Sequence, residues 1–174
     1  MMNRSQIVAR VALFAALAYV LAYASVFIPN VSLIYIVFFA AGVVYGARIA
    51  LMISGIGEFI WTVFNPLGMA PVTTTIAQII AMMLVGALGA LLYKSKFART
   101  VSVQGVIIYA LLGLTAGFIF QVILNGTDAW LYGPFWEYLI SGLGFALLNI
   151  VSNAVIFPVF YPVIVQLVKK ESAR

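Results

Sequence analysis

The chain alternates between long uncharged apolar runs and short clusters of turn residues. Residues 11–47 carry no charge, which is too long a stretch for one membrane helix of about 20 residues. Pro29 and Asn30 divide it, because both favour turns. The runs are continuously apolar, whereas barrel strands alternate between apolar and polar residues. The pattern therefore predicts an all-α polytopic membrane protein, with one transmembrane domain over residues 1–174.

Turn residues and charges divide the chain into six predicted transmembrane helices. Their ranges are residues 7–28, 33–45, 49–64, 72–93, 101–124 and 135–168. The predicted turns are at residues 29–30, 46–48, 65–68 and 125–128, each of which contains Gly, Pro or Asn. The second and third helices are short. The sixth is longer than a bilayer needs, and Pro158 and Pro162 predict a kink there or the end of its membrane part.

The basic residues predict the orientation of these helices. With six helices and the N-terminus inside, both termini are cytoplasmic, and so are all nine basic residues: Arg4, Arg10, Arg48, Lys94, Lys96, Arg99, Lys169, Lys170 and Arg174. Asp128 and Glu137 then lie outside, and Glu58 lies within a membrane helix. This distribution explains the net charge of +5, so we expect no nucleic-acid partner.

Composition excludes several classes of protein. Hydrophobic residues make up 66% of the chain and charged residues 7%, and the mean hydropathy is +1.19, which excludes an ordinary soluble domain. The chain has no Cys, no His and four acidic residues. We therefore expect no metal, no cofactor and no enzymatic nucleophile–base set. Residues 22–24 resemble a signal-peptide cleavage site, but the apolar run continues to Ile28, so we expect this segment to be retained.

Glu58 is the strongest candidate for a functional residue. A carboxyl group at the centre of a membrane helix normally faces protein or water and marks a function. Ser54, Glu58, Trp61 and Asn65 fall on one helical face. A carboxyl group beside an indole and an amide suits a planar ligand that carries donors or positive charge. The alternative is a structural Glu that is hydrogen-bonded to a neighbouring helix.

Further polar and aromatic residues could complete such a site. All three Trp residues lie in outer halves or outer loops, which suggests an aromatic site facing outward; the alternative is anchoring at the interface. The candidates in this region are Asn125, Asp128, Trp130, Tyr132, Trp136, Glu137 and Tyr138. Within the helices, Gln121 and Asn149 could reach a central cavity. For Gln78 and Asn153 we expect hydrogen bonds between helices.

Small residues at four-residue spacing predict close helix packing. The pairs are Ala12 and Ala16, Ala18 and Ala22, Gly113 and Gly117, and Gly142 and Ala146. For the last two pairs, packing within the bundle is sufficient. The alanine face of the first helix is wide enough to meet a separate protein as well.

Three segments resemble a known family. Residues 10–18, with Ala12 and Ala16, resemble the first-helix signature of the substrate-binding S components of energy-coupling factor (ECF) vitamin transporters. Residues 44–48 are similar to their aromatic-Gly-Pro/Ala-Arg turn. Residues 55–61 with 65–68 resemble their Gly-rich third helix, which carries an acidic residue.

The resemblance implies a membrane subunit that captures a vitamin or related micronutrient outside a prokaryotic cell. Such subunits work with a transmembrane coupling subunit and two ATP-binding subunits, and the resemblance places Ala12 and Ala16 against the coupling subunit. The chain itself has no phosphate-binding Gly-x4-Gly-Lys motif. Together, the residues and the resemblance give the candidate substrate site: Glu58, Trp61, Asn65, Gln121, Trp136, Glu137, Tyr138 and Asn149. The substrate stays open, and the alternative function is a structural six-span protein of the cell-shape type.

Overall fold

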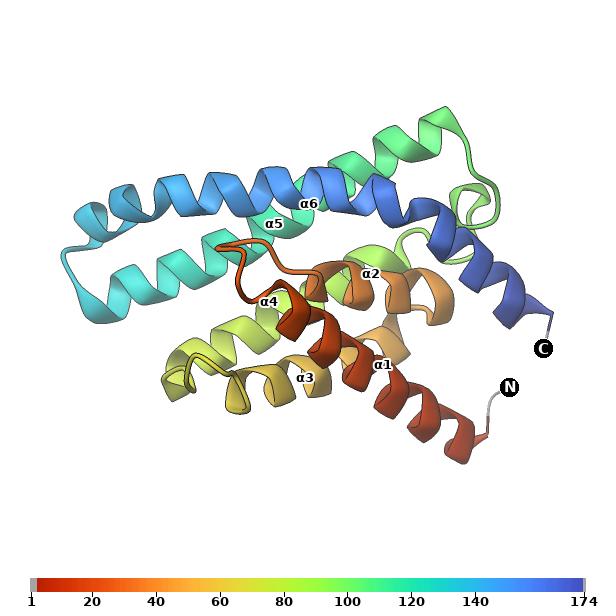
Figure 1. The fold of residues 1–174 in the computed structure, drawn as a ribbon, viewed down its shortest axis with the longest axis horizontal. Coiled ribbons are helices and arrows are strands. Elements are labelled where there is room, and N and C mark those ends of the chain that lie inside the picture. The colour runs from red at the N-terminus through yellow and green to blue at the C-terminus, as the bar shows by residue number, and fades with distance from the viewer. Residues whose placement is uncertain (1–2, 174) are drawn as a thin grey trace.

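The computed structural model describes residues 3–173, so Arg174 lies outside the described residues. The regular secondary structure of this part of the chain is all helical, as predicted, and includes no strand. The elements are α1 (Arg4–Ser25), α2 (Ile34–Tyr45), α3 (Ala47–Val63), α4 (Val72–Ala90), the short 3-10 helix η1 (Lys96–Ala98), α5 (Val103–Tyr132) and α6 (Phe135–Ser172). Figure 1 shows them as one bundle in which α5 and α6 form a long antiparallel pair.

Three of the predicted turns form where expected. Pro29 and Asn30 lie between α1 and α2, and Asn30 has a φ of 58°. Gly46 joins α2 directly to α3 with a φ of 79°, a conformation that costs little only for glycine. After α3, the backbone N–H of Gly68 donates to the carbonyl of Asn65 at 3.0 Å.

The predicted turn at residues 125–128 is wrong, because α5 continues through it to Tyr132. Side chains satisfy one another inside the helix there. Asn125 donates to Gln121 one turn earlier at 3.1 Å, and the Thr127 hydroxyl donates to the carbonyl of Ile123 at 2.7 Å. A single Gly126 costs a helix only about 1 kcal/mol relative to Ala. The turn signals were therefore too weak to end the helix.

Helix lengths divide the bundle into two groups. Within the described residues, four helices are long and apolar enough to cross a membrane, namely α1, α4, α5 and α6. By contrast, α2 has 12 residues and α3 has 17, so α2 spans only about 18 Å at 1.5 Å per residue. With 30 and 38 residues, α5 and α6 are about 45 and 57 Å long. Their turn projects beyond α3 and α4 on the left of Figure 1. Pro158 and Pro162 both lie inside α6, which continues past them.

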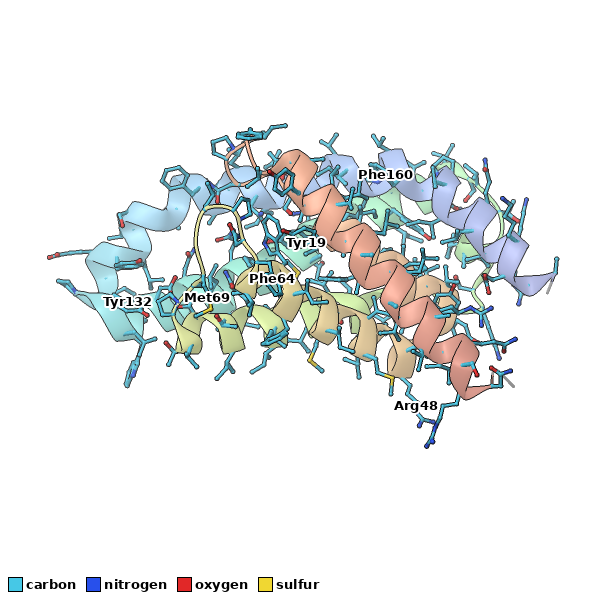
Figure 2. All side chains as sticks on the ribbon, turned by 60° about the horizontal axis from the view of Figure 1, so that its bottom comes forward. Tyr19, Arg48, Phe64, Met69, Tyr132 and Phe160 are labelled. Atoms are coloured by element: carbon cyan, nitrogen blue, oxygen red, sulfur yellow. The ribbon has the colours of Figure 1, made fainter. Side chains whose placement is uncertain are left out.

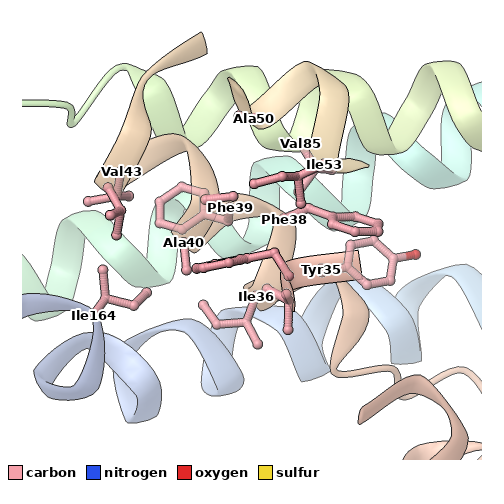
Figure 3. Packing of buried hydrophobic residues seen from close by; sticks show 14 of the residues in the cluster. Tyr35, Ile36, Phe38, Phe39, Ala40, Val43, Ala50, Ile53, Val85 and Ile164 are labelled. Carbon is pink, nitrogen blue, oxygen red and sulfur yellow. The ribbon is translucent and has the colours of Figure 1, made fainter. Parts of the chain in front are cut away.

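The core is built around α2, in which every residue except Tyr45 is buried. Figure 3 shows Phe38 and Phe39 of α2 packed among residues of neighbouring helices, including Ile53 and Val85. Glycines let the neighbours approach this helix, since a Cβ at Gly89 of α4 would collide with the backbone of Phe39. Small residues have the same role between α5 and α6, as predicted. A Cβ at Gly113 or Gly117 would collide with the backbone of α6.

Both described ends of the chain lie at the same end of the bundle (Figure 1). Arg10 of α1 and Glu171 of α6 form an ion pair there, which joins the first helix to the last. Arg48 lies near the start of α1, whereas Tyr132 lies at the opposite end of the molecule (Figure 2). We call these the basic end and the hairpin end.

Candidate functional site

A cavity of about 730 Å³ lies toward the hairpin end of the bundle, and residues of all six helices line it. Its size falls in the range of roughly 300–1,000 Å³ that is typical of sites for small molecules. The loop between α1 and α2 forms part of its wall, through residues 26 and 28–32. Five of the eight predicted substrate-binding residues line it: Glu58, Trp61, Gln121, Tyr138 and Asn149.

Glu58 is the most deeply buried acidic residue that the structure describes. It lies in the middle of α3, its exposed fraction is 2%, and its Oε2 atom has no hydrogen-bond partner among the described residues. An unsatisfied buried polar atom costs about 1–3 kcal/mol. The alternative was a structural Glu that is hydrogen-bonded to a neighbouring helix. No such hydrogen bond forms at this oxygen among the described residues.

Aromatic side chains from several helices line the same cavity as Glu58. Trp61 follows Glu58 by one turn and is held by Tyr19 of α1, whose ring meets it edge-on at 5.9 Å. The Tyr19 hydroxyl donates to the carbonyl of Phe64 at 3.0 Å, which fixes this contact. Tyr35 of α2 and Phe120 of α5 also line the cavity, with ring centroids 5.2 Å apart. A flat ligand ring in this cavity can therefore pack against aromatic side chains on more than one of its sides.

Two glutamines supply amide groups to the cavity. The Oε1 atom of Gln78 accepts from the Thr62 hydroxyl at 3.2 Å, and that of Gln121 accepts from Asn125 at 3.1 Å. Both amide oxygens are thus engaged by the protein, and among the described residues no hydrogen bond uses either amide nitrogen. The expected interhelical hydrogen bond of Gln78 forms between α4 and α3, but Gln78 lines the cavity as well.

Asn149 ties α6 to the loop that forms the cavity wall. Its Nδ2 atom donates to the carbonyl of Asn30 at 3.0 Å. Asn153, one turn further along α6, donates to the carbonyl of Asn149 at 2.9 Å, and its Oδ1 atom has no partner among the described residues. The hydrogen bond between helices that we predicted for Asn153 is therefore absent from the described contacts.

Three predicted site residues lie away from the cavity lining: Asn65, Trp136 and Glu137. The Oδ1 atom of Asn65 accepts from the backbone N–H of Leu67 at 2.9 Å, so it stabilises the turn after α3. Trp136 is 73% exposed and meets Phe135 edge-on. Because α5 is two turns longer than predicted, the first residues of α6 project past the cavity, and Tyr138 is the first residue of this helix that lines it. Glu137 precedes it in the exposed first turn.

Sequence reasoning missed several residues of the cavity wall. Tyr35 belongs to a helix without a polar face, so periodicity could not show which side meets the cavity. Asn30 was identified only as a turn residue, and Phe120 only as part of an apolar run. Asn125 and Asp128, by contrast, are among the predicted candidates of the outer region, and both line the cavity, although they belong to α5 and not to the predicted turn.

The two alanine pairs of α1 lie on different faces. Ala18 and Ala22 are buried, with exposed fractions of 0% and 1%. Ala12 and Ala16 are exposed. The second pair therefore packs inside the bundle, and the first remains available on the outer surface of α1.

The described residues contain no group of His, Cys, Asp or Glu that could hold a metal ion. A family model described as "ECF-type riboflavin transporter, S component" matches residues 2–167. Searches for similar curated proteins and for similar solved structures found no match.

Proposed function

The chain belongs to the family of ECF-type riboflavin transporter S components, and from this premise we propose that the cavity around Glu58 is its vitamin-binding site. It is a substrate-binding subunit of an ECF importer, and the family is one of transporter subunits rather than enzymes. The observation that carries the proposal is the buried Oε2 atom of Glu58, which has no partner within residues 3–173 and belongs to a residue that lines a cavity of ligand size. A bound donor removes the cost of leaving this oxygen unsatisfied.

The polar groups of the cavity favour a planar ring whose edge carries an N–H group between two carbonyl groups. Glu58 supplies an acceptor, and the amide nitrogens of Gln78 and Gln121 supply donors. Aromatic walls at Trp61 and Phe120 suit the flat faces of such a ring. The isoalloxazine ring of riboflavin has this edge, so riboflavin is the first ligand to test.

We place the hairpin end outside and the basic end in the cytoplasm of a prokaryotic cell, as a six-span protein of the plasma membrane. The clustering of basic residues at one end supports this orientation through the positive-inside rule. α2 and α3 are short, but the longer helices enclose α2, so it needs no lipid-facing length of its own. The partners that we propose are a transmembrane coupling subunit and two ATP-binding subunits.

Ligand binding by the purified chain tests the proposed site. We expect riboflavin to bind with an affinity that calorimetry can measure, and native mass spectrometry to show one ligand for each chain. A structural six-span protein would bind no small molecule. If riboflavin does not bind and another compound co-purifies, the site stands and the flavin assignment fails.

The exposed alanine pair of α1 offers a separate test of coupling. Ala16→Trp places a large ring on the outer face of α1, where we expect it to block contact with the coupling subunit. Riboflavin binding by the purified chain should be unchanged, and uptake by cells that express the whole transporter should be lost. Leu143→Trp, at an exposed position of α6, is the control and should retain uptake. Uptake that survives Ala16→Trp would remove α1 from the proposed docking surface.

A further inference from the structure

A second cavity, of about 910 Å³, lies at the basic end of the bundle. It is formed by the start of α1, the end of α2, the segment after α4 and the end of α6. Its charged residues are Arg10, Lys94, Arg99 and Glu171. It shares no lining residue with the cavity around Glu58.

The charges of this second cavity do not balance. Arg10 and Glu171 form an ion pair, and the guanidinium of Arg10 also lies 5.4 Å from the centre of the Tyr45 ring. Lys94 and Arg99 form no ion pair among the described residues; the Nζ atom of Lys94 lies 5.1 Å from the centre of the Tyr93 ring. Three basic side chains therefore face one carboxylate, and that carboxylate is already engaged.

Orientation in the membrane does not by itself require these residues to share a cavity. The positive-inside rule needs basic residues on one side, and Arg48, Lys96, Lys169 and Lys170 meet it without lining the cavity. The segment after α4 brings Lys94 and Arg99 to the same cavity as Arg10, and Lys94 has a positive φ of 63°. Its backbone is thus held in a conformation that is uncommon for a residue with a side chain.

The wall of this second cavity also contains apolar side chains next to the charged ones. Leu13 of α1, Val43 and Val44 of α2, and Val168 of α6 all line it. Leu13 is 66% exposed, so the apolar wall continues onto the lipid-facing surface of α1. A ligand that matches both parts carries an anionic phosphate group joined to a hydrocarbon chain.

We propose that this cavity binds the phosphate headgroup of an anionic phospholipid. Lys94 and Arg99 contact the phosphate, and an acyl chain follows Leu13 down the side of the bundle. Basic pockets between helices on the cytoplasmic side of membrane proteins bind anionic headgroups in this way, and guanidinium groups pair with phosphate oxygens in two-point contacts. The proposal does not depend on what binds at Glu58.

Native mass spectrometry of the full purified chain tests the proposal with phosphatidylglycerol, phosphatidylcholine and inorganic phosphate as probes. We expect one phosphatidylglycerol to be retained for each chain, and phosphatidylcholine to be retained at least about tenfold less, because each basic residue near the surface favours an anionic lipid. An excess of inorganic phosphate should not displace the lipid. If it does, the site is one for a small anion and the lipid proposal is overturned.

Substitutions locate the lipid. Lys94→Gln with Arg99→Gln should remove the preference for phosphatidylglycerol, and Arg99→Gln alone should reduce it. The matched control is Arg48→Gln with Lys96→Gln, which removes the same charge from the same end of the bundle outside this cavity. Circular dichroism checks that each variant is folded. An equal loss of preference in the control would show that general charge, and not the cavity, holds the lipid, which overturns the proposal.

Discussion

The two cavities at opposite ends of the bundle differ in how one acidic residue of each, Glu58 and Glu171, is satisfied; the other acid of the cavity around Glu58, Asp128, accepts a hydrogen bond from the Thr74 hydroxyl at 3.0 Å. At the basic end, Glu171 is paired with Arg10, and both side chains are 17% exposed. Toward the hairpin end, Glu58 is 2% exposed and its Oε2 atom has no partner among the described residues. An acid that the chain satisfies itself stabilises the fold. An acid that it leaves unsatisfied weakens the fold, and we interpret this as a requirement for a ligand.

The largest expected effect concerns binding at Glu58. Glu58→Gln keeps the size of the side chain and replaces a carboxylate acceptor by an amide. Since the loss of a good buried hydrogen bond costs about 1–3 kcal/mol, we expect riboflavin to bind roughly 10- to 100-fold more weakly. Calorimetry measures the change. Glu137→Gln, on the exposed first turn of α6, is the control, and an unchanged affinity for Glu58→Gln would contradict the proposed site.

The stability of the chain without ligand should change in the opposite direction. Glu58→Leu removes the unsatisfied polar group and keeps a similar volume, so we expect the free energy of unfolding to rise by about 1–3 kcal/mol. Thermal unfolding in detergent measures it. The same variant should lose riboflavin binding. A lower melting temperature would show that Glu58 stabilises the fold, and the contrast with Glu171 would disappear.

Trp61→Ala should weaken binding by about tenfold, because it removes an aromatic wall worth about 0.5–1.5 kcal/mol beyond its buried area. Trp136→Ala is the matched control, since this indole is exposed and does not line the cavity. Tryptophan fluorescence quenching by riboflavin offers a second readout. If Trp136→Ala reduces affinity as much as Trp61→Ala, the binding site extends to the hairpin.

The smallest effect is expected at the basic end, on the free energy of unfolding. Glu171→Gln removes the ion pair with Arg10, and we expect the free energy of unfolding to fall by about 1 kcal/mol, the upper range for a pair near the surface. Riboflavin affinity should not change, because the two cavities share no residue. Thermal unfolding and calorimetry measure both quantities. A change in affinity here would show that the two ends are coupled.

Most of the fold could be predicted from the sequence because continuous apolar runs and strong turn residues are local signals. Gly46 and Pro29 each mark a turn without any knowledge of the neighbouring helices. The end of α5 could not be predicted in this way. Hydrogen bonds from Asn125 and Thr127 to the preceding turn outweigh the local preference of residues 125–128 for a turn.

The candidate site could be predicted only where one helix carries its own pattern. Glu58 and Trp61 are three residues apart on α3, so their common face follows from helical geometry. Tyr35 enters the cavity wall because of how α2 is rotated within the bundle, and that depends on the packing of other helices. Trp136 was misplaced because the length of α5 determines how far the α5–α6 turn projects.

The enclosed position of α2 has a consequence for how such a sequence can change over generations. Nearly every side chain of this helix contacts protein, and an enlarged residue at Gly42 or Gly89 would collide with a facing backbone. Overpacking of this kind commonly costs about 1–3 kcal/mol, whereas exposed positions of α6 such as Leu147 need only remain compatible with lipid. Mutational drift should therefore be slowest in α2, the shortest of the six α-helices, although α2 contributes only Ile34 and Tyr35 to the cavity around Glu58.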